Sequence, residues 1–117
     1  MRCAIYFVPP ADDPLTVAAA LWLRRDPYSG AKLSGPVEGL TEADHAFLTA
    51  LPRRYGFHAT LKAPFRLADG KSVHELERRL GGFCERLPAI RLSTKIALRD
   101  NFFAFALETP EPELGVL

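Results

Sequence analysis

Apolar side chains recur at every second position of the segment RYGFHATLKAPFRL (residues 54–67), at Phe57, Ala59, Leu61, Ala63 and Phe65. This period of two is typical of a β-strand that buries one face. The intervening residues His58, Thr60 and Lys62 are therefore predicted to share the opposite face. An imidazole, a hydroxyl and an ammonium group on one face form a surface that can bind a phosphate-sized anion.

Length and composition favour one ordinary globular domain. The chain has 117 residues, 48% hydrophobic and 25% charged, and its formal net charge is only +1. This balance gives no general attraction to nucleic acid or membrane, so any anion binding must be local. Cys3 and Cys84 follow no metal or disulfide spacing and are predicted to be buried thiols. No apolar run is long enough for a membrane span or a signal peptide, so we expect a cytoplasmic protein.

The rest of the chain alternates between helix and strand patterns. Periodicity, proline and capping residues predict strands at 3–8, 54–67, 90–99 and 102–107, and helices at 14–25, 41–51 and 72–87, with Trp22 in the core. A further helical turn is predicted at 112–117. This order favours an α+β domain, with an antiparallel or mixed sheet of about four strands and helices packed on one face.

The string YGFHATLKAPF places a histidine, one further residue and a threonine on a strand between apolar residues. It resembles the first signature of the two-histidine (2H) phosphoesterase superfamily. Together with RCAIYFVPP and LWLRRDPYSGA, the block PRRYGFHATLKAPFRL is most similar to the uncharacterised proteins encoded in phosphonate-degradation operons. These three blocks span residues 2–67.

The resemblance implies a LigT-like fold of two lobes, each carrying one H-x-[Ser/Thr] motif, with the active site between them. Residues 1–117 would be a single lobe, the N-terminal half. His58 and Thr60 would be catalytic, in a metal-free and cofactor-free cleavage of a cyclic phosphate or related phosphodiester. His45 is followed by Ala-Phe and His74 by Glu-Leu, so neither supplies the second motif. We therefore expect this chain to be inactive without another source of that motif. We expect His45 to be solvated or partly packed.

Four further residues are candidates for substrate binding. Lys62 would add positive charge beside Thr60, and Tyr6 would line the same site if its strand neighbours the strand of His58; the alternative for Tyr6 is a core position. Arg54 and Tyr55 lead into the key strand and are candidates for phosphate contacts. The glycine- and proline-rich loop 26–40 is either a rim over the site or a surface excursion.

Two classes of function remain open from the sequence. One is half of a 2H phosphoesterase; the other is a non-catalytic module that binds a phosphate or nucleotide end. Either would take a phosphorylated small molecule, with nucleic acid only as a substrate end and no membrane partner. Exposed apolar surface would favour a homodimer. A metal site built from His45, His58 and His74 is disfavoured because their spacing matches no common ligand pattern.

Overall fold

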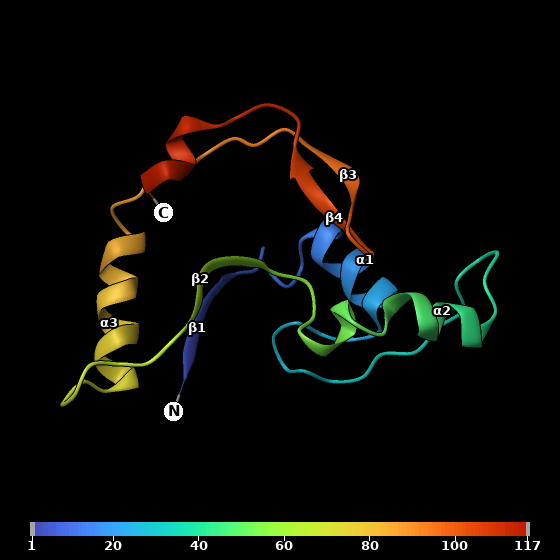
Figure 1. The fold of residues 1–117 in the computed structure, drawn as a ribbon, viewed down its shortest axis with the longest axis horizontal. Coiled ribbons are helices and arrows are strands. Elements are labelled where there is room, and N and C mark those ends of the chain that lie inside the picture. The colour runs from blue at the N-terminus through green and yellow to red at the C-terminus, as the bar shows by residue number, and fades with distance from the viewer. Residues whose placement is uncertain (1, 117) are drawn as a thin grey trace.

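The computed structural model describes residues 2–116 as a chain of short elements that form an open arch (Figure 1). The first half contains β1 (Cys3–Phe7), α1 (Pro14–Leu23), α2 (Glu42–Thr49) and the short 3-10 helix η1 (Pro52–Arg54). The second half contains β2 (Ala59–Phe65), α3 (Val73–Cys84), β3 (Thr94–Arg99), β4 (Phe102–Leu107) and the 3-10 helix η2 (Pro112–Val116). The radius of gyration is 16.4 Å, larger than the roughly 13 Å of a compact domain of about this length.

The four strands form two separate antiparallel ribbons, β1–β2 and β3–β4, each of two strands. The mixed α+β composition, the strand count and the antiparallel pairing agree with the sequence-based prediction. The prediction of one sheet covered by helices on one face is wrong for residues 2–116, because the ribbons do not pair and the helices contact them at only a few points. The hairpin β3–β4 is joined to the segment before β2 by Phe105, whose ring meets Phe57 edge-on at 6.0 Å.

Irregular pairing between β1 and β2 changes which residues share a face. Tyr6 pairs with Thr60, but Ile5, the residue before Tyr6 on β1, pairs with Lys62. One step along β1 therefore corresponds to two steps along β2. Neighbouring residues on a strand point to opposite faces, whereas directly paired residues share one. Thr60 is therefore on the face of Tyr6, and Lys62 is on the face of Ile5. The regular alternation predicted for His58, Thr60 and Lys62 is interrupted before Lys62.

The helices begin where their capping residues predict. The side chains of Asp13, Thr41 and Ser72 accept hydrogen bonds from backbone N–H groups in the first turns of α1, α2 and α3, which satisfies donors that have no partner within a helix. Helix α1 ends at Arg24, which adopts a left-handed conformation with φ 52°. The predicted final turn forms as the 3-10 helix η2. Within residues 2–116, no helix is both long and apolar enough to cross a membrane.

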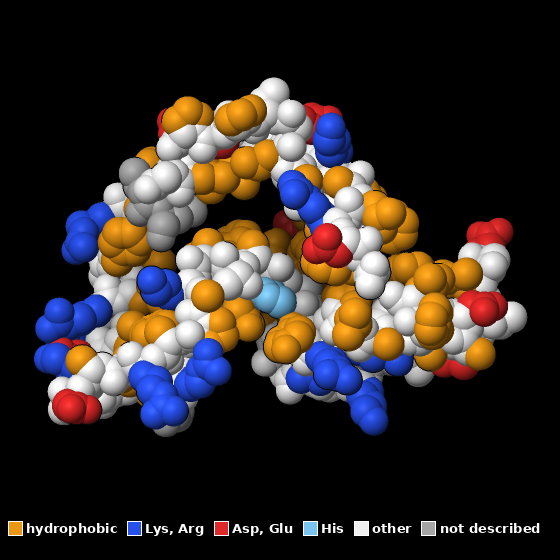
Figure 2. All heavy atoms as spheres, viewed as in Figure 1, with side chains coloured by type: hydrophobic (Ala, Val, Ile, Leu, Met, Phe, Trp, Pro, Cys, Tyr) orange, Lys and Arg blue, Asp and Glu red, His pale blue; other side chains and the backbone are white. Residues whose placement is uncertain are grey.

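Complete burial is confined to a small part of the chain. Among the residues whose burial is described, the buried ones are Thr16, Ala20, Leu23, Arg24, His45, Thr49 and Gly56. The prediction that Trp22 anchors the core is wrong, since its side chain is 39% exposed. Hydrophobic side chains are spread over the visible face and along the inner side of the arch, beneath which the surface is hollowed (Figure 2). The interior of this fold therefore lies mainly between α1 and α2.

Candidate functional site

His58 lies immediately before the first residue of β2 and is half-buried. Its Nδ1 is 2.9 Å from the backbone carbonyl oxygen of Gly56. The ring of Tyr6, on the paired strand β1, lies against the imidazole with the ring centroids 4.0 Å apart and the planes inclined by 32°. The imidazole is thus held at one nitrogen by the backbone and on one face by an aromatic ring.

Two of the predicted site residues, Tyr6 and Tyr55, lie beside this imidazole, and a third, Thr60, is the strand partner of Tyr6. Tyr6 stacks on the imidazole and pairs with Thr60 across the ribbon, so the Thr60 hydroxyl and His58 belong to the same side of β2. The ring of Tyr55 is 6.2 Å from the His58 ring and is 64% exposed. Tyr6 is itself 40% exposed, so it does not occupy the core position that was the alternative for it. The structure thus brings together Tyr6, Tyr55, His58 and Thr60 on an accessible surface.

The two predicted cationic residues are not part of this group. Lys62 is on the other face of the ribbon because of the irregular pairing described above. Arg54 is exposed at the end of η1. Its backbone N–H donates to the Leu51 carbonyl oxygen, and among the described residues no hydrogen bond or ion pair involves its guanidinium group. Its neighbour Arg53 is tied to α2 through a 2.5 Å hydrogen bond from Nη2 to the Thr49 hydroxyl. The positive charge expected beside His58 is therefore not supplied by Lys62.

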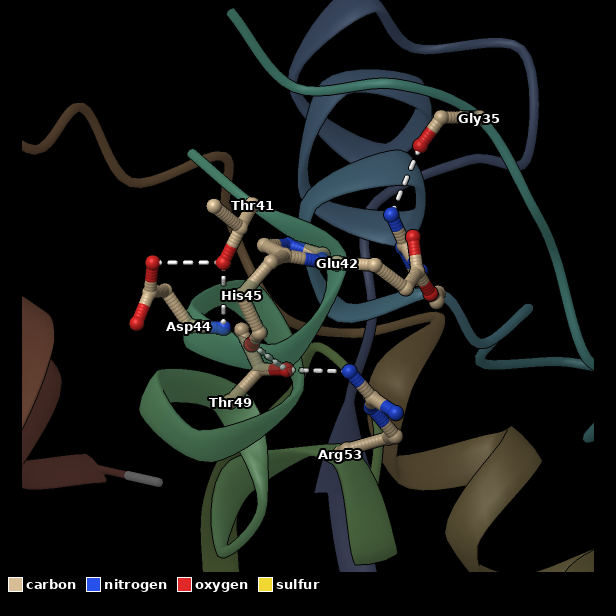
Figure 3. A network of polar contacts seen from close by, with 8 residues as sticks. Gly35, Thr41, Glu42, Asp44, His45, Thr49 and Arg53 are labelled. Carbon is tan, nitrogen blue, oxygen red and sulfur yellow. Dashed lines mark hydrogen bonds and ion pairs between the residues drawn. The ribbon is translucent and has the colours of Figure 1, made fainter. Parts of the chain in front are cut away.

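The histidine of α2 differs from the sequence-based prediction, which treated it as solvated or partly packed. His45 is only 1% exposed, and the Trp22 ring meets it edge-on with the centroids 5.0 Å apart. Neither ring nitrogen has a hydrogen-bond partner among the described residues. Figure 3 shows His45 between α2 and the elements around it, with Thr49 one turn further along the helix. His45 is part of the helical interior and is separate from the group around His58.

Polar contacts link α1, α2 and the loop between them (Figure 3). The buried Arg24 guanidinium donates to the Glu42 carboxylate and, through Nη2, to the Gly35 carbonyl oxygen at 2.8 Å. The Thr49 hydroxyl donates to the His45 carbonyl oxygen at 2.8 Å and accepts from Arg53. These contacts stabilise the junction of the helices. Among the described residues, no group of three or more His, Cys, Asp or Glu is placed to hold a metal ion.

The first part of the loop 26–40 is a closed turn. Asp26 Oδ1 accepts hydrogen bonds from the N–H groups of Tyr28 and Ser29, both at 2.8 Å, and the Gly30 N–H donates to the Asp26 carbonyl. The hydrogen bonds from the backbone N–H groups of Ser29 and then Tyr28 lower the pKa of the Asp26 carboxyl group below its ordinary value. The Tyr28 hydroxyl donates to the Pro9 carbonyl oxygen at 2.6 Å. The turn is thus tied to the segment that follows β1.

Gly56 is a site residue that the sequence-based reasoning missed. It is buried, it has a φ of +75°, and its carbonyl receives the His58 contact. A glycine two residues before a candidate histidine was the available signal, because glycine readily adopts positive φ. The sequence alone does not indicate that this glycine packs against Pro27, which lies 29 positions earlier.

Comparisons with known proteins match this chain to one family of unknown function and to two curated relatives that share a name. The family described as "Protein of unknown function (DUF1045)" matches residues 60–117, just under half of the chain, beginning at Thr60. Over 118 residues the chain is 38% identical to the "Ribose 1,5-bisphosphate phosphokinase PhnN" of Janthinobacterium sp. (strain Marseille), a match that covers 99% of this chain and 26% of the relative. Over 104 residues it is 35% identical to the protein of the same name from Laribacter hongkongensis (strain HLHK9), covering 89% of this chain and 25% of the relative.

The chain therefore spans about a quarter of the length of the curated relatives it matches. Each of the two alignments includes the region of His58, because they cover 99% and 89% of the chain. No solved structure matches the chain at a significant level.

Proposed function

We propose that this chain supplies one histidine half of a metal-independent 2H-type phosphoesterase that cleaves a cyclic phosphate or a related phosphodiester. The observation that carries the proposal is the group of Tyr6, His58 and Thr60 on one face of the β1–β2 ribbon. His58 is the acid–base group, and the Thr60 hydroxyl donates to a non-bridging phosphate oxygen. Because that oxygen gains negative charge in the transition state, a donor aimed at it lowers the barrier.

The reaction needs two imidazoles. A neutral imidazole removes a proton from the attacking water, and a protonated imidazole donates a proton to the leaving oxygen; the unperturbed histidine pKa of about 6.5 suits both tasks. His58 provides one of them. His45 is buried between the helices and His74 is on α3, so neither stands beside His58. The second imidazole is proposed to come from polypeptide beyond these 117 residues, with a second copy of this chain as the alternative source.

The comparisons support a role in phosphonate metabolism. The relatives are named as PhnN, a kinase of ribose 1,5-bisphosphate, and the sequence blocks resemble proteins of phosphonate-degradation operons. A phosphate-binding P-loop requires the pattern GxxxxGK[ST] between a strand and a helix. Here Gly70, Lys71 and Ser72 precede α3, but Phe65 occupies the first glycine position, and Lys71 forms an ion pair with Glu75. We therefore do not assign kinase chemistry to this chain.

The test compares histidine variants of a longer protein that contains this chain and is active on cyclic phosphates, assayed with and without EDTA. His58→Ala is expected to lower turnover by about a hundredfold or more, the usual scale for losing a positioned acid or base. His74→Ala is the matched control, because His74 is exposed on α3, and its turnover is expected to be unchanged. Equal activity of both variants on every accepted substrate would remove His58 from the mechanism.

The presence of a single H-x-[Ser/Thr] motif in this chain favours a second candidate function, a phosphate-binding module without turnover. Titration of the chain with inorganic phosphate, followed by calorimetry, distinguishes the two. The module predicts binding that His58→Ala and Thr60→Ala both weaken, together with no hydrolysis by any longer protein containing the chain. Hydrolysis that depends on His58 would reject the module.

A further inference from the structure

We propose that Gly56 and the turn at residues 26–30 are positioning elements that fix the tautomer of His58 and make Nε2 its reactive nitrogen. The second half of this statement rests on the proposed function of His58 as an acid–base group. The first half concerns only the geometry of the ring and can be tested without activity.

The tautomer follows from the identity of the contact. His58 Nδ1 lies 2.9 Å from the Gly56 carbonyl oxygen, which can only accept a hydrogen bond. Nδ1 must therefore carry the proton. In a neutral imidazole the other nitrogen then has the free lone pair. His58 would accept a proton at Nε2, on the side of the ring away from Gly56.

The carbonyl of Gly56 is placed by a backbone conformation that favours glycine. Its φ is +75°, a region that residues with a Cβ adopt only with strain. A Cβ on this residue would also lie 3.3 Å from Pro27 Cα and 3.6 Å from Pro27 Cβ. Any larger residue must therefore either change φ or displace Pro27. Both changes would move the carbonyl that holds the His58 ring.

Pro27 is in turn fixed by the turn around it. The Asp26 carboxylate accepts two backbone hydrogen bonds from the following residues, and the Tyr28 hydroxyl donates to the Pro9 carbonyl oxygen at 2.6 Å. Pro9 follows β1, the strand that also carries Tyr6. The imidazole is thus held at Nδ1 through Gly56 and on its face by Tyr6, and both supports meet at the end of β1. The sequence left the loop 26–40 as either a rim or a surface excursion; its first part, residues 26–30, acts here as a support for the Gly56 carbonyl.

The first experiment compares two glycine variants by ¹⁵N NMR of the His58 ring in the 117-residue chain. Gly56→Ala is the test. Gly70→Ala is the matched control, because Gly70 has a φ of +76° and an added Cβ there meets nothing within 4 Å. We expect the original chain and Gly70→Ala to show the Nδ1–H tautomer at neutral pH, and Gly56→Ala to lose most of it. A dominant Nε2–H tautomer in the original chain, or identical ring spectra for the two variants, would overturn the proposal.

A second variant covers the case in which Gly56→Ala does not fold. Tyr28→Phe removes the hydroxyl that donates to Pro9 but keeps the ring, so the turn stays packed while its tie is lost. We expect a smaller decrease of the Nδ1–H tautomer with an unchanged circular dichroism spectrum. A Tyr28→Phe spectrum identical to that of the original chain would show that the turn does not position His58.

Activity separates this inference from the function on which it rests. In the longer active protein, Gly56→Ala is expected to lower kcat by between about tenfold and a hundredfold with little change in KM, since a small misplacement of a reacting group is costly. Gly70→Ala should retain kcat. If the tautomer result holds while His58→Ala stays fully active, the proposed function fails and the positioning role stands. If His58→Ala is inactive while Gly56→Ala keeps its tautomer and kcat, the function stands and the positioning role fails.

Discussion

The pair of helices α1 and α2 and the hairpin β3–β4 reach opposite levels of burial within one chain. Six of the buried residues lie in or directly after the two helices: Thr16, Ala20, Leu23, Arg24, His45 and Thr49. The hairpin residues 94–107 are all exposed or half-buried. Four of the six are not core hydrophobic residues but threonine, arginine or histidine. Side-chain hydrogen bonds accompany the burial of Thr16, Arg24 and Thr49 in the helical pair, whereas hydrogen bonding in the hairpin comes chiefly from its backbone.

The hairpin presents an apolar face that nothing in the described chain covers completely. Ile96 pairs with Phe105 and Leu98 with Phe103, so these four side chains share one face. Their exposed fractions are 68%, 44%, 65% and 66% respectively. A two-stranded ribbon is only marginally stable in water without a covered face. The comparison teaches that correct strand pairing does not by itself provide a core.

The largest expected effect tests this difference with two leucines. Leu23→Ala removes a buried side chain from α1 and is expected to lower the free energy of unfolding by about 2–4 kcal/mol. Leu98→Ala, on the exposed face of the hairpin, is expected to change it by no more than about 0.5 kcal/mol. Urea denaturation followed by circular dichroism measures both. Equal losses would show that the hairpin face is packed in solution and that the two regions do not differ in burial.

A smaller effect is expected from the buried polar contacts. Thr49→Val keeps the shape of the side chain but removes the hydroxyl, which leaves Arg53 Nη2 and the His45 carbonyl oxygen without this partner. The expected loss of unfolding free energy is about 1–3 kcal/mol, the cost of unsatisfied buried groups. Thr94→Val on exposed β3 is the control and should be near neutral. An unchanged free energy of unfolding for Thr49→Val would mean that water replaces the hydroxyl and reaches the residues around Thr49.

Sequence patterns predicted the elements well because capping and periodicity are local. Asp13, Thr41 and Ser72 marked the helix starts correctly. The alternation over residues 90–99 indicated the strand that forms β3, although β3 begins only at Thr94. Tyr6 was a candidate only on the condition that its strand neighbours the strand of His58, and the pairing of β1 with β2 meets that condition.

Non-local geometry accounts for what was missed. The irregular register that separates Thr60 from Lys62 depends on how two distant strands meet, and periodicity within one strand does not reveal it. The burial of His45 depends on the packing of α2 against Trp22, and the sequence around His45 does not indicate this contact. The support of Gly56 by Pro27 likewise joins residues that are far apart in the chain.

The attachment of the hairpin provides a third test of the comparison. Phe105 meets Phe57 edge-on, and such aromatic pairs contribute about 0.5–1.5 kcal/mol beyond their burial. Phe105→Leu is therefore expected to lower the free energy of unfolding by about 1 kcal/mol. Phe103→Leu, on the same face but 66% exposed, should have little effect. Equal effects in denaturant titrations would show that Phe105 is not a specific point of attachment.

The smallest expected effect is a difference in acid sensitivity between the turn at residues 26–30, which follows α1, and the hairpin β3–β4. The lowered pKa of Asp26 means that its charged form is favoured in the folded turn, by the N–H groups of Ser29 and then Tyr28. Its contribution is complete above the ordinary carboxyl value of 3.8 and is lost as the pH falls through the lower folded value, because protonation weakens both hydrogen bonds. Since the turn supports Gly56, acid should loosen the loop and the His58 ring before it affects the hairpin, whose backbone hydrogen bonds do not titrate.

Amide chemical shifts of Tyr28 and Ser29, followed below pH 5 beside those of residues 94–107, measure this order. Asp26→Asn removes the titrating group and should abolish the early change; a simultaneous change in both regions would show that the turn and the hairpin unfold as one unit.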